Sequence, residues 1–289
     1  MVSSRSFSAA SVLSLASSVL AQTCTLQFDG RIPADFGVAS FDTANNFFSS
    51  GNVFGQGLKF SQLLKTPAAT GSLFDTNTIP VEVTISDKSI FAPSADNIQT
   101  GFRRAELLPA SNSGTDPSTT GVKTLHFSLM KDAQRPLNLS HEYQLVFLES
   151  NDFSTNQLVL KTGTLIGGGG GANPDTLQLF GNVNSPQLLF STPFTPGVFH
   201  NFAVTLDFNK LTSQVFFSTG TAALKAVTQA LPNDVSGQGQ FHFGVLKKPT
   251  DGGNDIVHNG FQEAGIDEGI IYGGIFQEDS STGCVSLSP

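Results

Sequence analysis

Hydrophobic and polar residues alternate with a period of two along most of this chain, and a helical period hardly appears. Successive side chains of a β-strand point to opposite sides, so this alternation predicts strands that bury one face. The alternating segments are residues 81–86, 124–129, 141–148, 157–162, 202–208, 214–217 and 240–246. The pattern predicts one short helix, over residues 59–64. Many strands without intervening helices favour an all-β fold, a β-jelly-roll or concanavalin-like sandwich of two antiparallel sheets with few short helices.

The segments between the predicted strands are rich in glycine, proline and small polar residues, which marks them as loops. They include residues 111–121, residues 167–175 with a glycine run, and residues 249–260. No Lys-Ser or Lys-Thr pair follows the glycines, so they do not form a phosphate-binding loop. The chain shows no dividing linker and no internal repeat, and we therefore expect a single domain over residues 22–289.

The first residues are typical of a secretory signal peptide. Arg5 supplies a positive charge, residues 9–20 are apolar or small, and small or aliphatic residues precede an expected cleavage after Ala21. The apolar stretch is too short to span a membrane, and no later segment reaches that length. We expect residues 1–21 to be removed and the mature protein to be secreted and extracellular, with no membrane partner.

Two cysteines, Cys24 and Cys284, lie near the two ends of the expected mature chain. An oxidising compartment allows them to form a disulfide bond that holds the terminal strands together, with two unrelated free thiols as the alternative. Asn138-Leu139-Ser140 is an N-glycosylation sequon, so Asn138 is the predicted glycosylation site.

The formal net charge of −8 argues against nucleic acid, anionic membranes and strongly acidic polymers as partners. Charged residues make up 13% of the chain, whereas small polar residues, glycine and phenylalanine are abundant, which suits a neutral partner rich in hydroxyl groups. No Gly-x-Ser-x-Gly nucleophile elbow follows a strand, and histidines and cysteines do not cluster with the spacing of metal ligands. We expect a monomer without a cofactor or a bound metal.

Ionisable residues recur in the middle of several predicted strands, on the face opposite the apolar residues. Alternation predicts that Arg104 shares a strand face with Glu106, and Glu142 with Gln144. It likewise predicts a shared face for His126, Thr124 and Ser128, and another for Gln157 and Lys161. His242 lies between two phenylalanines that are predicted to face inward. Gathered on one curved sheet, these side chains predict a cleft that binds sugar. The competing interpretation is an ordinary strand face, where a glutamate is usually solvated and a histidine, such as His200, makes structural hydrogen bonds.

Paired carboxyl groups are what hydrolysis of a glycosidic bond requires: one protonates the leaving oxygen, and the other activates water or attacks the anomeric carbon. Glu106 and Glu142 are the predicted pair. Alternation predicts that Tyr143, Leu145 and Phe147 look inward, and it assigns Glu149 to the face of Leu145 and Phe147. Glu149 is nevertheless the main alternative to Glu142, because it lies at a strand end where a loop can turn it into the cleft. Arg104 and the histidines are placed to bind sugar hydroxyl groups or to tune the pKa of a carboxyl group.

Several blocks of the sequence resemble one family of carbohydrate-active enzymes. They are VEVTISDKSIF (81–91), GFRRAEL (101–107), HEYQLVF (141–147), FHFGVLKKP (241–249) and YGGIF (272–276). Together these blocks resemble glycoside hydrolase family 131. The likeness runs over essentially the whole mature chain, and the GFRRAEL block is fairly specific.

The resemblance implies a secreted fungal β-glucanase with a β-jelly-roll fold and an open cleft, acting on β-1,3-, β-1,6- and β-1,4-glucans. It also implies an inverting mechanism with two glutamates, of which Glu106 is the first; strand facing places the second at Glu142. The predicted substrate-binding residues are Arg104, His126, Gln144, Lys161, His242 and Tyr272. The chain has no tryptophan, so phenylalanines, Tyr143 or Tyr272 must supply any stacking on sugar rings.

Two other functions are compatible with the pattern. A polysaccharide lyase on a similar jelly roll would use a tyrosine or histidine base and an arginine that neutralises a uronate, but the acidic net charge counts against an acidic polymer. A non-catalytic glucan-binding wall protein would bind β-glucan and release no new reducing ends. The absence of tryptophan counts slightly against a dedicated binding module.

Overall fold

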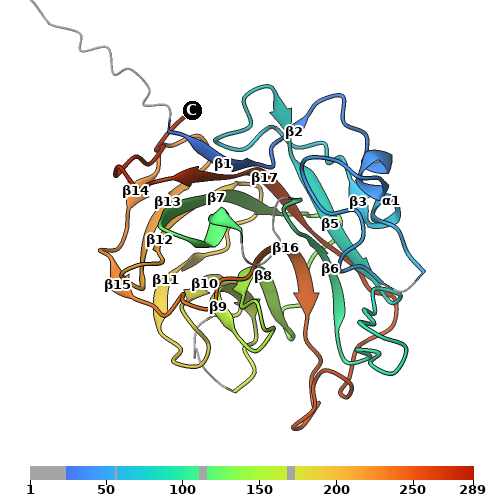
Figure 1. Cartoon of the computed structure of the whole chain (residues 1–289). Coiled ribbons are helices and arrows are strands. Elements are labelled where there is room, and N and C mark those ends of the chain that lie inside the picture. The colour runs from blue at the N-terminus through green and yellow to red at the C-terminus, as the bar shows by residue number, and fades with distance from the viewer. Residues whose placement is uncertain (1–23, 56, 111–115, 168–172) are drawn as a thin grey trace, which may run out of the picture.

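The structure, a computed structural model, describes residues 24–55, 57–110, 116–167 and 173–289, and the expected signal peptide lies outside these ranges. Two antiparallel sheets form the body of the protein, with few short helices (Figure 1). This arrangement confirms the predicted all-β sandwich. Helix α1 (Phe60–Leu63) lies where a short helix was predicted, and two 3-10 turns cover Val38–Asp42 and Pro117–Thr119.

The smaller sheet has six strands in the order β11-β10-β9-β8-β16-β6. Their bounds are β6 (Arg103–Leu107), β8 (Glu142–Glu149), β9 (Asn156–Gly163), β10 (Thr176–Phe180), β11 (Leu188–Pro193) and β16 (Gln240–Lys247). Strands β8, β9 and β16 agree with three of the predicted segments to within one residue at each end.

The larger sheet has nine strands, seven of them in the order β14-β13-β12-β7-β17-β5-β3, with β1 paired to β17 and β15 paired to β13. Their bounds are β1 (Leu26–Asp29), β3 (Leu64–Lys65), β5 (Val81–Ser86), β7 (Val122–Lys131), β12 (His200–Asp207), β13 (Thr212–Thr219), β14 (Lys225–Ala226), β15 (Leu231–Pro232) and β17 (Asp267–Asp279). A separate pair joins β2 (Ile32–Pro33) to β4 (Thr78–Ile79).

The hydrophobic core lies between the two sheets, because the apolar residues of each alternating strand face inward. Leu125 and Phe127 of β7 belong to the same buried cluster as Phe243 and Val245 of β16. The rings of Phe127 and Phe243 meet edge to face, with their centroids 6.2 Å apart. Each strand of the sandwich therefore turns its polar residues to an outer face.

The alternation breaks once within β8, and this break decides which of its side chains reach the outer face. Leu145 and Val146 both lie in the main core, and the pairing of β8 with β9 and with β16 shifts register at this point. Phe147 consequently leaves the core and joins a separate apolar cluster on the outer face. The prediction that Phe147 faces inward is wrong, because a bulge shifts the phase of alternation by one residue.

The predicted disulfide bond is confirmed. Cys24 and Cys284 are bonded, with their Cα atoms 5.7 Å apart. Cys24 precedes β1, Cys284 follows β17, and these two strands pair. The bond therefore joins the ends of two strands that are already neighbours in the larger sheet.

Candidate functional site

The outer face of the six-stranded sheet brings together most of the predicted site residues. Strands β6, β16, β8 and β9 lie side by side there. The ionisable and amide side chains on this face include Arg104, Glu106, His242, Glu142, Gln144, Glu149 and Lys161. The apolar cluster of Phe102, Phe147, Val159 and Leu246 lies among them. The face thus combines charged groups with apolar surface.

Glu106 lies on β6, and its side chain is fully buried. Arg104 holds it from the same face, donating Nε to Oε1 at 2.8 Å and Nη2 to Oε2 at 2.7 Å. The Nδ1 atom of His242 lies 2.7 Å from Oε2. Burial acts to raise the pKa of Glu106, but the charge of Arg104 and the hydrogen bond to His242 outweigh it and lower the pKa to about 2. Glu106 is therefore an ionised carboxylate whose two oxygen atoms are taken by protein partners.

His242 connects the buried Glu106 to the more exposed Glu149. Its Nε2 atom lies 3.4 Å from Oε2 of Glu149, whose side chain is 25% exposed. Its ring stacks on Phe147, with centroids 4.2 Å apart. Burial acts to lower the pKa of His242, but the hydrogen bond to Glu106 and the charges of Glu106 and Glu149 outweigh it and raise the pKa overall. The geometry favours a charged imidazolium between two carboxylates, with Glu149 at the solvent end.

Two residues beneath this group make the arrangement possible, and sequence reasoning missed both roles. Gly244 pairs with Glu106, and a Cβ atom at Gly244 would lie 2.9 Å from the Cγ atom of Glu106. The hydroxyl of Tyr272 hydrogen-bonds the carbonyl oxygens of Leu145 at 2.8 Å and Gly244 at 2.7 Å, beside the register shift of β8. Tyr272 is fully buried between the sheets, which corrects the prediction that it contacts sugar: it supports the strands under the site.

Glu142 lies at the other end of β8 from Glu149, and the structure does not bring it together with Glu106. Its Oε1 atom lies 2.7 Å from Nζ of Lys248 and 3.1 Å from Nζ of Lys161. Burial acts to raise the pKa of Glu142, but the charges of the two lysines lower it overall. Its neighbours are cations that hold it ionised. The geometry therefore favours Glu149, the alternative, as the carboxyl group that works with Glu106.

Gln144 and Lys161 occupy the middle of the same face. They are paired across β8 and β9, and Oε1 of Gln144 accepts a hydrogen bond of 3.0 Å from Nδ2 of Asn156. The Nζ atom of Lys161 lies 5.6 Å from the ring centroid of Phe180 on the next strand. These groups offer donors, acceptors and an aromatic ring along β8 and β9.

His126 lies on the other sheet. Its Nε2 atom is 2.9 Å from Oε2 of Glu278, its ring stacks on Phe276, and its side chain is fully buried. Alternation placed His126 correctly on the face opposite Leu125, but that face belongs to the nine-stranded sheet. Its predicted place in the sugar-binding cleft is therefore corrected. His200 makes a structural hydrogen bond to a backbone carbonyl, as expected.

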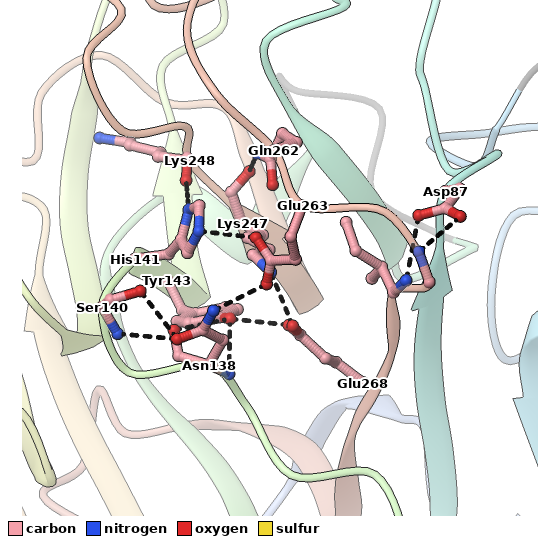
Figure 2. A network of polar contacts seen from close by, with 12 residues as sticks. Asp87, Asn138, Ser140, His141, Tyr143, Lys247, Lys248, Gln262, Glu263 and Glu268 are labelled. Atoms are coloured by element: carbon pink, nitrogen blue, oxygen red, sulfur yellow. Dashed lines mark hydrogen bonds and ion pairs between the residues drawn. The ribbon is translucent and has the colours of Figure 1, made fainter.

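Figure 2 shows a second polar network, where β8 begins and β16 ends. Lys247 is fully buried, and its Nζ atom lies 2.5 Å from Oε1 of Glu263 and 2.6 Å from Oε1 of Glu268. The hydroxyl of Tyr143 donates to Oε2 of Glu268 at 2.7 Å. Tyr143 is therefore part of the packed interior and offers no stacking surface. The network fixes residues 262–268 against β8 and β16.

Asn138 lies at the exposed rim of this network (Figure 2). Its Nδ2 atom donates to Oε1 of Glu263 at 2.8 Å, and its Oδ1 atom accepts from the hydroxyl of Ser140 at 2.8 Å. The sequon is thus on the surface, and glycosylation of Asn138 stays a prediction.

Two further observations concern the residues that the structure describes. Among them, no group of three or more His, Cys, Asp or Glu side chains is arranged to hold a metal ion. Helices in the same ranges are too short or too polar to cross a membrane.

Comparison with known proteins gives a family for this chain. A family model described as the glycoside hydrolase 131 catalytic N-terminal domain matches residues 26–283. The fold is similar to a GH131 β-glucanase catalytic domain from Podospora anserina, with a TM-score of 0.68 and 22% identity, covering 91% of this chain and 98% of that one. It is also similar to the catalytic domain of the family 131 protein from Coprinopsis cinerea, with a TM-score of 0.66 and 23% identity, covering 92% and 98%. A search of curated proteins gave no match. Because the family model spans nearly the whole described chain, this protein belongs to glycoside hydrolase family 131.

Proposed function

We propose that this glycoside hydrolase is a secreted β-glucanase that cleaves β-1,3-, β-1,6- and β-1,4-linked glucans with inversion at the anomeric carbon. The observation that carries the proposal is the chain of contacts from Glu106 through His242 to Glu149. A structural relative described as a β-glucanase and the negative net charge, which favours a neutral polymer, support it. We also propose that residues 22–289 act as one monomeric domain, exported by the signal peptide of residues 1–21.

Inverting hydrolysis adds water to the anomeric carbon while the bond to the leaving oxygen breaks. One group removes a proton from the water, and another gives a proton to the leaving oxygen, so the protons balance. We assign contact with the reacting atoms to Glu149, since it is the exposed end of the chain of contacts. In this assignment the Glu149 carboxylate removes the proton from the attacking water and passes it to solvent between turnovers, while the leaving oxygen takes its proton from solvent. The charged ring of His242 stays protonated throughout and orients Glu149.

Glu106 has a different role in this proposal. Its oxygen atoms are taken by Arg104 and His242 and are not exposed. We therefore propose it as a positioning residue that keeps His242 charged and oriented.

The chain has no tryptophan, and Phe153 should provide the aromatic surface on which a sugar ring stacks. It lies in the loop after Glu149, its side chain is 67% exposed, and its φ of 59° is one that bulky residues seldom adopt. The loop fixes it, because its N–H donates to the carbonyl of Ser150 at 2.9 Å. We expect Phe153→Ala to raise KM for soluble glucan by about fivefold with kcat nearly unchanged, since stacking contributes about 1 kcal/mol.

Steady-state kinetics on oligosaccharides of increasing length measure this effect. Phe261→Ala is the matched control, because Phe261 is 60% exposed in another loop and should leave both constants unchanged. Phe153→Tyr should keep the wild-type KM. An unchanged KM in Phe153→Ala would show that the ring does not contact substrate.

Release of reducing ends from laminarin, a β-1,6-glucan and soluble cellulose derivatives tests the proposed function. Proton NMR of the first product tests inversion, which predicts the α-anomer before mutarotation. Wild-type protein that releases no reducing ends from any of these glucans would overturn the proposal. An unsaturated product that absorbs in the ultraviolet would assign a lyase instead.

A further inference from the structure

A cavity of about 840 Å³ lies over the outer face of the nine-stranded sheet. Its floor contains Glu82, Ile271 and Met130, which lie side by side on β5, β17 and β7 because Ile271 pairs with both of the others. Its walls come mainly from residues 65–70 and 130–137. Binding sites for small ligands occupy about 300–1,000 Å³. The cavity is on the opposite side of the sandwich from Glu149.

A group of three charged residues defines the polar side of this cavity. Nη1 of Arg135 donates to Oδ2 of Asp132 at 2.7 Å and to Oε2 of Glu82 at 3.1 Å. Gly269 leaves the space that the Glu82 carboxyl group occupies, since a Cβ atom there would lie 2.3 Å from Oε1. Burial and the charge of Asp132 raise the pKa of Glu82 to about 7, against the effect of Arg135. Below that pH the cavity presents the carboxylic acid of Glu82, the carboxylate of Asp132 and the guanidinium of Arg135 together.

The rest of the lining favours a neutral, hydroxyl-bearing ligand over an ion. Arg135 is paired with three carboxyl groups, those of Glu82, Asp132 and Asp267, and Lys131 is paired with Asp175, so most of the charge in the walls is already compensated. Apolar surface comes from Met130, Ile271, Leu137 and three prolines. A pyranose ring presents hydroxyl groups at its edge and C–H groups on its faces, and it matches donors and acceptors set beside apolar walls.

We propose that this cavity is a second saccharide-binding site, which holds a segment of neutral β-glucan away from the site of hydrolysis. The choice of β-glucan as ligand rests on the proposed function, whereas the cavity and its polar group do not. A polymer that is held at both faces of the sandwich stays on the enzyme longer than one held at a single site.

Calorimetric titration of a Glu149→Gln parent with laminaritetraose and cellotetraose tests the proposal without hydrolysis. The parent should bind two molecules per chain. Ala133→Trp, which fills the cavity from an exposed lining position, should reduce this to one. Ala223→Trp is the matched control, because Ala223 is exposed between β13 and β14, and it should leave two. Asp132→Ala should weaken the same site by about tenfold through loss of an acceptor.

In the active enzyme, Ala133→Trp should reduce the fraction bound to insoluble glucan several-fold and leave tetraose hydrolysis unchanged. A parent that binds at most one tetraose, or two that Ala133→Trp does not displace, would overturn the second site. Wild-type hydrolysis separates the two proposals. If the wild type cleaves no glucan but Ala133→Trp still removes one bound tetraose, the proposed function fails and the second site stands.

Discussion

Replacing Glu149 by glutamine should lower kcat on every glucan that the wild type hydrolyses by about 10³-fold, while KM changes little. Glutamine keeps the size and hydrogen-bonding shape of glutamate but cannot exchange a proton. Glu106, His242 and Glu149 form a chain of contacts, and Glu149 is its more exposed member. Glu106 is its buried member, and its oxygen atoms are bonded by Arg104 and His242. The loss should therefore fall on the chemical step, and single-turnover rates on laminarin measure it directly.

Glu142→Gln is the matched comparison, because the same substitution is made at the other end of the same strand. It removes the partner of Lys161 and Lys248, so it should lower thermal stability and leave kcat within about tenfold of the wild type. The reverse result, with activity lost in Glu142→Gln and kept in Glu149→Gln, would reassign the second carboxyl group to Glu142. Circular dichroism spectra of both variants show whether each is folded.

The strands could be predicted because each strand buries only one of its two faces. A strand of this kind alternates apolar and polar residues, and the sequence shows that alternation. Segments 81–86 and 240–246 reappear as β5 and β16 almost unchanged. The same reasoning grouped Arg104 with Glu106 correctly, since both lie in an unbroken strand and bond each other. The GFRRAEL block added the expectation that Glu106 belongs to the site.

The second carboxyl group could not be chosen from the pattern alone. Alternation assigned Glu149 to the face of Phe147, and Phe147 to the core. The register shift at Leu145 and Val146 moves both Phe147 and Glu149 to the outer face. A bulge of this kind leaves no local signature in a run of apolar residues. Position in three dimensions, not spacing along β8, distinguishes Glu149 from Glu142.

Alternation predicts which face of its strand a side chain occupies, but it does not predict which sheet that strand belongs to. His126 and His242 both stand opposite apolar neighbours, but β7 and β16 lie in different sheets. Their outer faces are therefore on opposite sides of the sandwich. The buried roles of Tyr143 and Tyr272 escaped prediction for a related reason: a tyrosine can sit in the core when its hydroxyl finds an acceptor, as both do here.

Arg104→Met should lower the free energy of unfolding at pH 7 by about 3–5 kcal/mol, because it leaves the fully buried Glu106 carboxylate without its bidentate partner. Urea denaturation measures the loss. Arg31→Met is the control, since Arg31 pairs with Asp29 at the surface and should cost less than about 1 kcal/mol. Combining Arg104→Met with Glu106→Gln should restore part of the stability, because the second change removes the unpaired charge. An equal loss in the single and double variants would point to lost packing instead.

The pH dependence of stability separates this charge effect from a packing effect. The folded state lowers the pKa of Glu106 from an ordinary 4.5 to about 2. The unfolded chain therefore takes up this proton first as pH falls, so the stabilisation is complete above pH 4.5 and is lost progressively towards pH 2. Without Arg104 the folded pKa must rise, and the Arg104→Met variant should lose less additional stability over that range than the wild type does. Parallel stability curves for the two proteins between pH 5 and pH 2 would show that Arg104 does not control the ionisation of Glu106, and the control would then pass to His242, the other group that bonds its carboxylate.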